Sequence, residues 1–247
     1  MLGRGHRFLE AFGDDVALVR PHLRPVSLAA GQVLNEPGEE IGYVYFLRSG
    51  VVSKLIPFED GTEIECVLVG QRGAVGAMSA LGVRTAITRD VCHLPCEAWR
   101  LPTERLSEAS RRSERIHDVL DHYCAWMMTC AIRNGACNAR HGVENRLCRW
   151  LLTCSDVLDS DEIALSQDVF AKMLGVQRSS VSPILQKLRR EGLVSLERAR
   201  LRLLDRPGLM ARACECYAVM KSAEHRSMAT MRKPAQILGA VGGLRRH

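Results

Sequence analysis

The sequence lacks any long hydrophobic segment and any familiar catalytic signature. No apolar run approaches the ~18 residues that a helix needs to cross a membrane, and the first ten residues lack the apolar core of a secretory signal. There is no glycine-rich phosphate loop with a lysine, no nucleophile elbow and no paired metal motif. We therefore expect a cytoplasmic protein that is not an enzyme and has no membrane partner.

The composition is that of an ordinary globular protein. The chain has 247 residues, of which 47% are hydrophobic and 25% charged, enough for one or two domains with real cores. Its net charge of +6 permits a nucleic-acid partner without proving one, because the location of the charge matters more than its sum. In the cytosol the 10 cysteines are expected to be thiols.

Short alternating runs separated by glycines fill the first half of the chain. One such run covers residues 43–48 and is closed by Ser49-Gly50. Asp60-Gly61 lies between two further runs, 51–56 and 63–69, and this dipeptide is typical of a hairpin. Short strands at this spacing predict an antiparallel barrel or roll, which we assign to residues 1–111 together with an N-terminal helix.

A long helix is predicted for residues 112–142, because no proline occurs between 113 and 140 and apolar residues recur at three-and-four spacing. Its length and position after the β-domain favour a dimerisation helix. A helix packed on its own domain is the alternative. The residues expected in the dimer contact are Ile116, Leu120, Tyr123, Met127, Cys130 and Asn134.

Residues 143–209 have the layout of a DNA-reading helical unit. Ser166 is a good N-cap for a short helix, Gly175 is a tight-turn residue, and the following helix has polar side chains at its exposed start. A helical domain with a solvated basic face is the alternative. The residues expected to face base edges are Arg178, Ser179, Ser182 and Gln186, and those expected at the DNA backbone are Ser166, Gln167, Lys187, Arg189, Arg198 and Arg200.

Two short strands within this segment, residues 193–196 and 201–204, form a predicted wing with arginines near its tip. Residues 210–247 form a C-terminal extension. Beyond about Glu224 the chain is predicted to be poorly structured, and Gly242-Gly243 followed by Arg245-Arg246 indicates a basic tail that is partly disordered.

The segment LSQDVFAKMLGVQRSSVS at residues 165–182, with EGLV at 191–194, closely resembles the winged helix-turn-helix of the CRP/FNR family of regulators. Residues 31–50 are similar to the cyclic-nucleotide-binding β-roll of that family. The resemblance covers roughly residues 20–209. It implies an α+β chain with an antiparallel β-roll, a long dimerisation helix and a C-terminal winged helix-turn-helix. It also implies a homodimer on a palindromic operator in double-stranded DNA, with RNA polymerase as a partner.

The resemblance assigns roles to individual residues of the second helix. Arg178 matches the arginine with which the family reads a guanine. Ser182 matches the serine of the anaerobic-regulator branch, whereas Ser179 stands where the family often has a glutamate. Pro183 replaces a common arginine and cannot read a base. The target sequence is therefore expected to differ from the family consensus.

The sensor half departs from the family pattern. Gly76 is followed by Ala77, where members that bind cyclic AMP have a glutamate for the ribose, while Arg84-Thr85 resembles the phosphate-binding pair. Losing the carboxylate argues against cyclic AMP. Another anion at Arg84, or no ligand there at all, are the alternatives. Because no cysteine precedes Cys66, an N-terminal iron–sulfur cluster is not expected either, and the effector stays unknown.

The cysteines suggest a weaker hypothesis and no committed metal site. Cys137 and His141 are four residues apart on a helix, half of a possible zinc or haem site. Buried cysteines more often serve as small apolar residues. A thiol or metal switch through Cys130, Cys137 or His141 is a hypothesis. The alternative function is a sensor that binds a small ligand, a metal or a redox signal and acts through protein partners.

Overall fold

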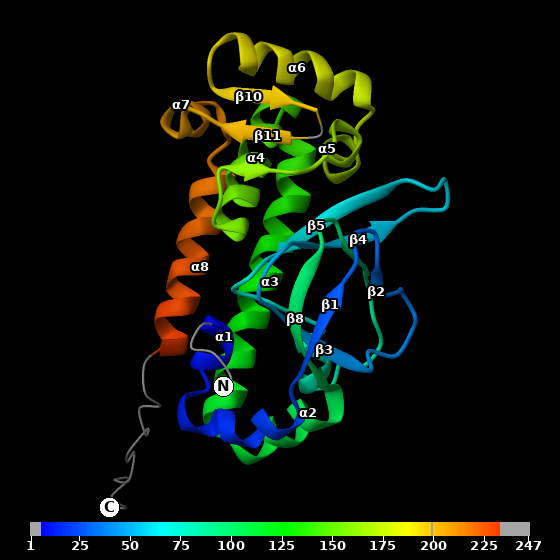
Figure 1. Ribbon diagram of the computed structural model, residues 1–247, viewed down its shortest axis with the longest axis vertical. Coiled ribbons are helices and arrows are strands. Elements are labelled where there is room, and N and C mark those ends of the chain that lie inside the picture. Colours follow the sequence, from blue (N-terminus) through cyan, green and yellow to red (C-terminus); the bar gives the residue numbers. More distant parts are fainter. Residues whose placement is uncertain (1–5, 199, 233–247) are drawn as a thin grey trace, which may run out of the picture.

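The computed structural model describes residues 6–198 and 200–232 and has two lobes joined by a long helix. Figure 1 shows a β-rich lobe, the helix α3 beside it, and a mostly helical lobe at the far end of α3. Helix α8 returns alongside α3 towards the first lobe. In these described ranges, no helix is both long and apolar enough to cross a membrane.

The β-rich lobe confirms the predicted antiparallel roll. Short helices precede it, and its strands form two four-stranded sheets with the orders β1-β8-β3-β6 and β2-β7-β4-β5. The elements of this lobe are α1 (Arg7–Glu10), η1 (Gly13–Leu18), η2 (Arg20–His22), β1 (Arg24–Leu28), β2 (Val33–Asn35), β3 (Tyr43–Leu47), β4 (Val52–Pro57), β5 (Glu63–Val69), β6 (Ala74–Val75), η3 (Ala77–Leu81), β7 (Arg89–Cys92), β8 (Cys96–Pro102) and α2 (Thr103–Arg112). The expected hairpin at Asp60-Gly61 joins β4 to β5.

Helix α3 (Glu114–Arg140) is part of the core of this lobe. Ser113 caps it by accepting a hydrogen bond from the backbone N–H of Ile116. Tyr123 reaches into the roll, where its hydroxyl donates to the carbonyl of Ala74 at 3.0 Å and its ring lies 4.7 Å from that of Phe8. Burial raises the pKa of Tyr123, so the phenol stays neutral and acts as a hydrogen-bonding anchor.

The residues of α3 predicted to form the dimer contact pack inside their own chain. Its six residues (Ile116, Leu120, Tyr123, Met127, Cys130 and Asn134) are all buried, packed within this chain against the roll and α8. This face of α3 therefore agrees with the alternative interpretation, in which the helix packs on its own domain. The opposite face of α3 exposes Met128 and Ile132, which are 61% and 67% accessible.

The second lobe confirms the predicted helical unit with a wing. Its three-stranded sheet has the order β10-β11-β9. Ala199, which follows Arg198 in the sequence, lies outside the described residues. The elements are α4 (Val143–Leu158), β9 (Glu162–Ile163), α5 (Gln167–Leu174), α6 (Arg178–Arg190), β10 (Val194–Glu197), β11 (Arg200–Leu203), α7 (Arg206–Arg212) and α8 (Cys216–Arg232).

The prediction of poor structure beyond Glu224 is wrong as far as Arg232, because α8 continues to that residue. Met220 and Met231 of α8 are buried in the same core as α3 and the roll. The Ser227 hydroxyl adds a hydrogen bond to the backbone carbonyl of His122 at 3.0 Å. Tertiary packing thus stabilises a helix with little amphipathic signal of its own. The expected basic tail, residues 233–247, lies outside the described residues.

The two lobes share a buried carboxylate. Glu65 on β5 accepts hydrogen bonds from Ser53 on β4 and, at 2.7 Å, from the indole N–H of Trp150 on α4. Burial raises the pKa of Glu65 to about 7, although both hydrogen bonds act in the opposite direction. The folded protein therefore holds a proton at this site at mildly acidic pH.

This proton predicts a pH dependence of stability. Between pH 4.5 and about 7 the folded Glu65 binds more protons than the unfolded one, so the free energy of unfolding falls as pH rises, by up to about 1.4 kcal/mol per unit. In Glu65→Gln this fall is expected to disappear, whereas the exposed-site control Glu197→Gln keeps it. Urea unfolding between pH 5 and 8 measures the slope, and an unchanged slope in Glu65→Gln contradicts the assignment.

Candidate nucleic-acid interface

Helices α5 and α6 form a helix-turn-helix with the expected turn chemistry. The Ser166 hydroxyl caps α5 by accepting from the N–H of Val169 at 3.4 Å. Gly175 ends α5 with a φ of +61°, a left-handed conformation that suits glycine. Helix α6 then begins at Arg178 and buries Val181, Leu185 and Leu188. Its remaining face is directed away from the core.

That outer face of α6 carries the predicted base-reading residues. Arg178, Ser179 and Gln186 are exposed, and Ser182 is partly buried because its hydroxyl donates to Gln167 at 2.6 Å. Arg178 makes an ion pair with Asp168 at 3.2 Å, and both side chains are more than 60% exposed. An exposed pair of this kind contributes little energy, so the guanidinium can exchange the carboxylate for a base edge.

Pro183 lies in the second turn of α6. A proline there cannot donate the backbone hydrogen bond to the carbonyl of Ser179, four residues earlier. The side chain is exposed on the same helix as Ser179 and Ser182. It offers an apolar surface where the resemblance leads one to expect an arginine.

The residues predicted to contact phosphates fall into two groups. Arg189, Arg198 and Arg200 are exposed, Arg200 with an ion pair to Glu162 at 2.7 Å. Lys187 instead contacts Glu144 of α4 at 2.8 Å, and its hydrogen bond is the main cause that lowers the pKa of that carboxyl. Lys187 thus ties α6 to α4.

Two of the three residues predicted to bind a ligand line the same cavity. Gly76 and Thr85 line a cavity of about 30 Å³ in the roll, room for about two water molecules, where small-molecule pockets measure about 300–1,000 Å³. Arg84 is not among the residues lining it and lies 3.5 Å from Glu40 and 3.7 Å from Glu104. The cavity wall also holds the Lys54–Asp90 ion pair, 2.7 Å long.

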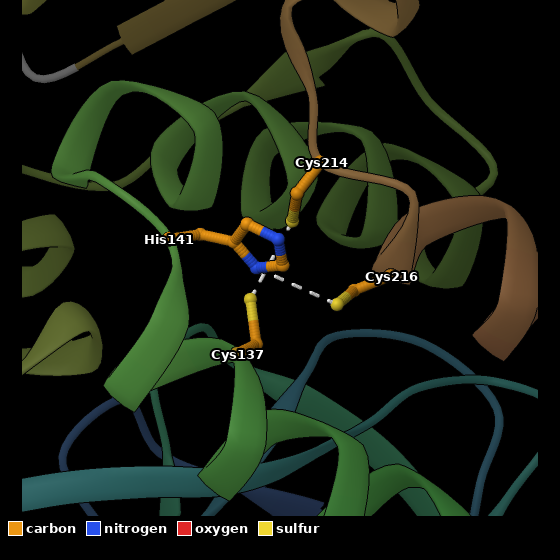
Figure 2. Close-up of side chains that lie close together, drawn as sticks. All are labelled: Cys137, His141, Cys214 and Cys216. Carbon is orange, nitrogen blue, oxygen red and sulfur yellow. Dashed lines mark hydrogen bonds between the residues drawn. The ribbon is translucent and has the colours of Figure 1, made fainter.

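Cys137 and His141 lie close together, as their spacing predicts. Two further residues, which the sequence analysis did not connect with them, lie beside them. Figure 2 shows Cys214, between α7 and α8, and Cys216, the first residue of α8, directed at the same point. The short spacings of the two pairs were the available signal. Nothing in the sequence indicates that segments more than 70 residues apart meet here.

The lobes contact each other beside the helix-turn-helix turn. Gly175 leaves so little room that a Cβ atom there would lie 2.9 Å from Ile64 of β5. Lys172 of α5 forms an ion pair with Glu63, also on β5. The strand that carries both partners is therefore in direct contact with the element that positions α6.

Comparisons with known proteins agree with this architecture. Residues 25–113 match the cyclic nucleotide-binding domain family, and residues 145–212 match the Crp-like helix-turn-helix domain family. No curated protein matches the chain.

Several solved structures share the fold. FixK2 from Bradyrhizobium japonicum has 17% identity and a TM-score of 0.70, covering 78% of this chain and 98% of that one. A CRP-family transcriptional regulator from Thermus thermophilus has 24% identity and a TM-score of 0.64, covering 76% and 96%. The c-di-GMP-responsive global regulator CLP from Xanthomonas campestris has 21% identity and a TM-score of 0.63, covering 80% and 98%.

Three features agree on one family: the order of the two matched domains, the long helix between them and the shared fold. The chain belongs to the CRP/FNR family of transcriptional regulators, with a cyclic-nucleotide-binding-type domain followed by a DNA-binding helix-turn-helix domain.

Proposed function

We propose that this protein is a homodimeric regulator that binds a palindromic DNA operator through α6. The observation that carries the proposal is the exposed face of α6, where Arg178, Ser179 and Gln186 project from a domain of the Crp-like type. A helix presented in this way fits the major groove. The wing arginines, Arg198 and Arg200, lie at the edge of the same lobe and suit phosphates.

The exposed face of α3 supports the dimer. Met128 and Ile132 are large apolar side chains open to solvent in the single chain. They belong to a row of exposed residues at alternating spacings of three and four, and the other members of the row are small. That row is Ala125, Met128, Ile132, Gly135 and Ala139. This spacing is that of a coiled-coil seam, and glycine and alanine allow two helices to approach closely. A two-fold axis along this seam would present two copies of α6 to successive major grooves.

We further propose that the effector is not cyclic AMP. The small cavity of the roll and the methyl group of Ala77 offer neither the volume nor the carboxylate that a ribose needs. Contact between β5 and α5 supplies a physical route for a signal, because Glu63 and Ile64 touch the element that positions α6. A ligand would act by binding one arrangement of the lobes better than another.

The experiment that tests the proposal is selection of bound duplexes from a random DNA library with the purified protein, followed by titration of the enriched sequence at several salt concentrations. We expect a palindromic motif. We also expect an affinity that falls by about 10³–10⁵ between 50 and 200 mM salt, if a dimer neutralises about six to ten phosphates.

Two outcomes contradict the proposal. Binding that neither selects a motif nor depends on salt would favour a sensor that acts through protein partners. An enriched motif without dyad symmetry would still agree with a DNA-binding function, but it would overturn the homodimeric arrangement.

A further inference from the structure

Two junctions between helices lie side by side. The first is the end of α3, which supplies Cys137, with His141 as its C-cap residue. The second runs from α7 into α8 and supplies Cys214 and Cys216, the latter as the first residue of α8. Their four potential ligand atoms all lie within 4.8 Å of one another. Figure 2 shows the three sulfurs and the imidazole converging from the two segments.

Two distances between the potential ligand atoms are close to those of a tetrahedral zinc site. With Zn–S bonds of about 2.3 Å and Zn–N bonds of about 2.0–2.1 Å, the edges of a tetrahedron measure about 3.8 Å between sulfurs and about 3.6 Å from sulfur to nitrogen. Here the sulfurs of Cys137 and Cys214 are 3.5 Å apart, and the Cys216 sulfur is 3.7 Å from Nδ1 of His141. A disulfide would require about 2.05 Å.

The cysteines are not filling an apolar core. Cys137, Cys214 and Cys216 form a buried cluster of their own, separate from the two large hydrophobic cores. Cys148 and Cys154 illustrate the ordinary role, since they are buried among aliphatic and aromatic side chains of the second core. Three thiols that contact one another in place of hydrocarbon gain little from the hydrophobic effect, and this favours a ligand set.

The histidine is oriented as in a metal centre. Its Nδ1 faces Cys216, while its Nε2 lies 3.2 Å from the carboxylate of Glu215. Zinc-binding histidines usually donate the second ring N–H to a carboxylate or a carbonyl, which fixes the tautomer and makes the ligating nitrogen more basic. Glu215, between two of the cysteines in sequence, occupies that supporting position.

The surroundings suit a centre with net negative charge. Three thiolates around a divalent cation leave one negative charge. Arg146 and Arg149 are both buried, and each interacts electrostatically with Cys214. Burying a guanidinium is costly unless an opposite charge compensates it. A zinc–thiolate group supplies that charge.

We infer that Cys137, His141, Cys214 and Cys216 bind one Zn²⁺ ion that fastens the end of α3 to the start of α8. All four positions of the tetrahedron come from the protein, so the site is structural and not catalytic. The ion would lock the hinge between α3 and α4, at Gly142, and hold α8 against α3. This inference is independent of the proposed operator binding, because it concerns the free chain.

Metal analysis of the full-length protein, purified without chelators, tests the site. We expect about one zinc per chain in the parent protein, little zinc in Cys214→Ser, and a full complement in Cys148→Ser, a control at an equally buried cysteine outside the cluster. Removal of the zinc with a chelator is expected to lower the Tm by at least about 10 °C, and adding Zn²⁺ back should restore it.

Cobalt gives a readout that does not depend on the variants folding. The metal-free parent protein titrated with Co²⁺ should develop the visible bands of tetrahedral cobalt with thiolate ligands, saturating at about one ion per chain. The site is overturned if the parent protein binds neither ion after reconstitution, if Cys214→Ser keeps its zinc, or if Cys148→Ser loses as much. A Cys137–Cys214 disulfide in the freshly purified protein would overturn it as well.

Discussion

Replacing Ile132 by glutamate should convert the proposed dimer into monomers and lower the affinity for a palindromic operator by about 10²–10⁴. Ile132 is 67% exposed in the single chain and lies in the middle of the small-residue face of α3. In a two-stranded seam this position would be buried against its counterpart. Two glutamates there would bring like charges together in an apolar contact, while neither side chain disturbs the core of its own chain.

Light scattering after size-exclusion chromatography measures the oligomeric state, and titration of an operator and of a single half-site measures the affinities. The matched control is Phe58→Glu, which places the same charge at an exposed apolar side chain in the β4–β5 hairpin. It should remain dimeric. We expect the half-site affinity of Ile132→Glu to stay near that of the parent chain. If this variant remains a dimer with full operator affinity, the two-fold contact lies elsewhere.

The apolar periodicity of α3 predicted the helix. It did not predict which surface each face of the helix packs against. Apolar spacing shows that a face is buried and does not show against what. The stronger stripe, with Tyr123 and Met127, faces the core of its own chain. The weaker row with Met128 and Ile132 is left open to solvent. Sequence reasoning therefore assigned the dimer contact to the more hydrophobic of two faces.

Features that depend on distant segments were the ones that the sequence did not predict. Cys137 meets Cys214 across 77 positions of the chain, a pairing that only the packing of α8 on α3 produces. Lys187 has the helical position of a phosphate contact, yet Glu144 of α4 holds it in place. The strands, the turn glycine Gly175 and the N-cap Ser166 are local features, and for these the sequence was sufficient.

Arg178→Ala is expected to weaken binding of the preferred operator about 5- to 150-fold, equivalent to about 1–3 kcal/mol, and to abolish the preference for guanine at one position of each half-site. The side chain is 62% exposed and forms an exposed ion pair with Asp168. Its removal therefore costs the fold little. A guanidinium offers two parallel donors to O6 and N7 of guanine, which no neighbouring side chain of α6 can replace.

Competition titrations with operators changed at single positions distinguish recognition of a base from non-specific electrostatic attraction to the DNA backbone. Arg178→Lys keeps the charge but not the two-pronged geometry, so it should recover part of the affinity and little of the guanine preference. Arg198→Ala, at the wing, should weaken all sequences alike and reduce the salt slope by about one. If Arg178→Ala also weakens all sequences equally, its partner is a phosphate, and base recognition must then come from Ser179, Ser182 or Gln186.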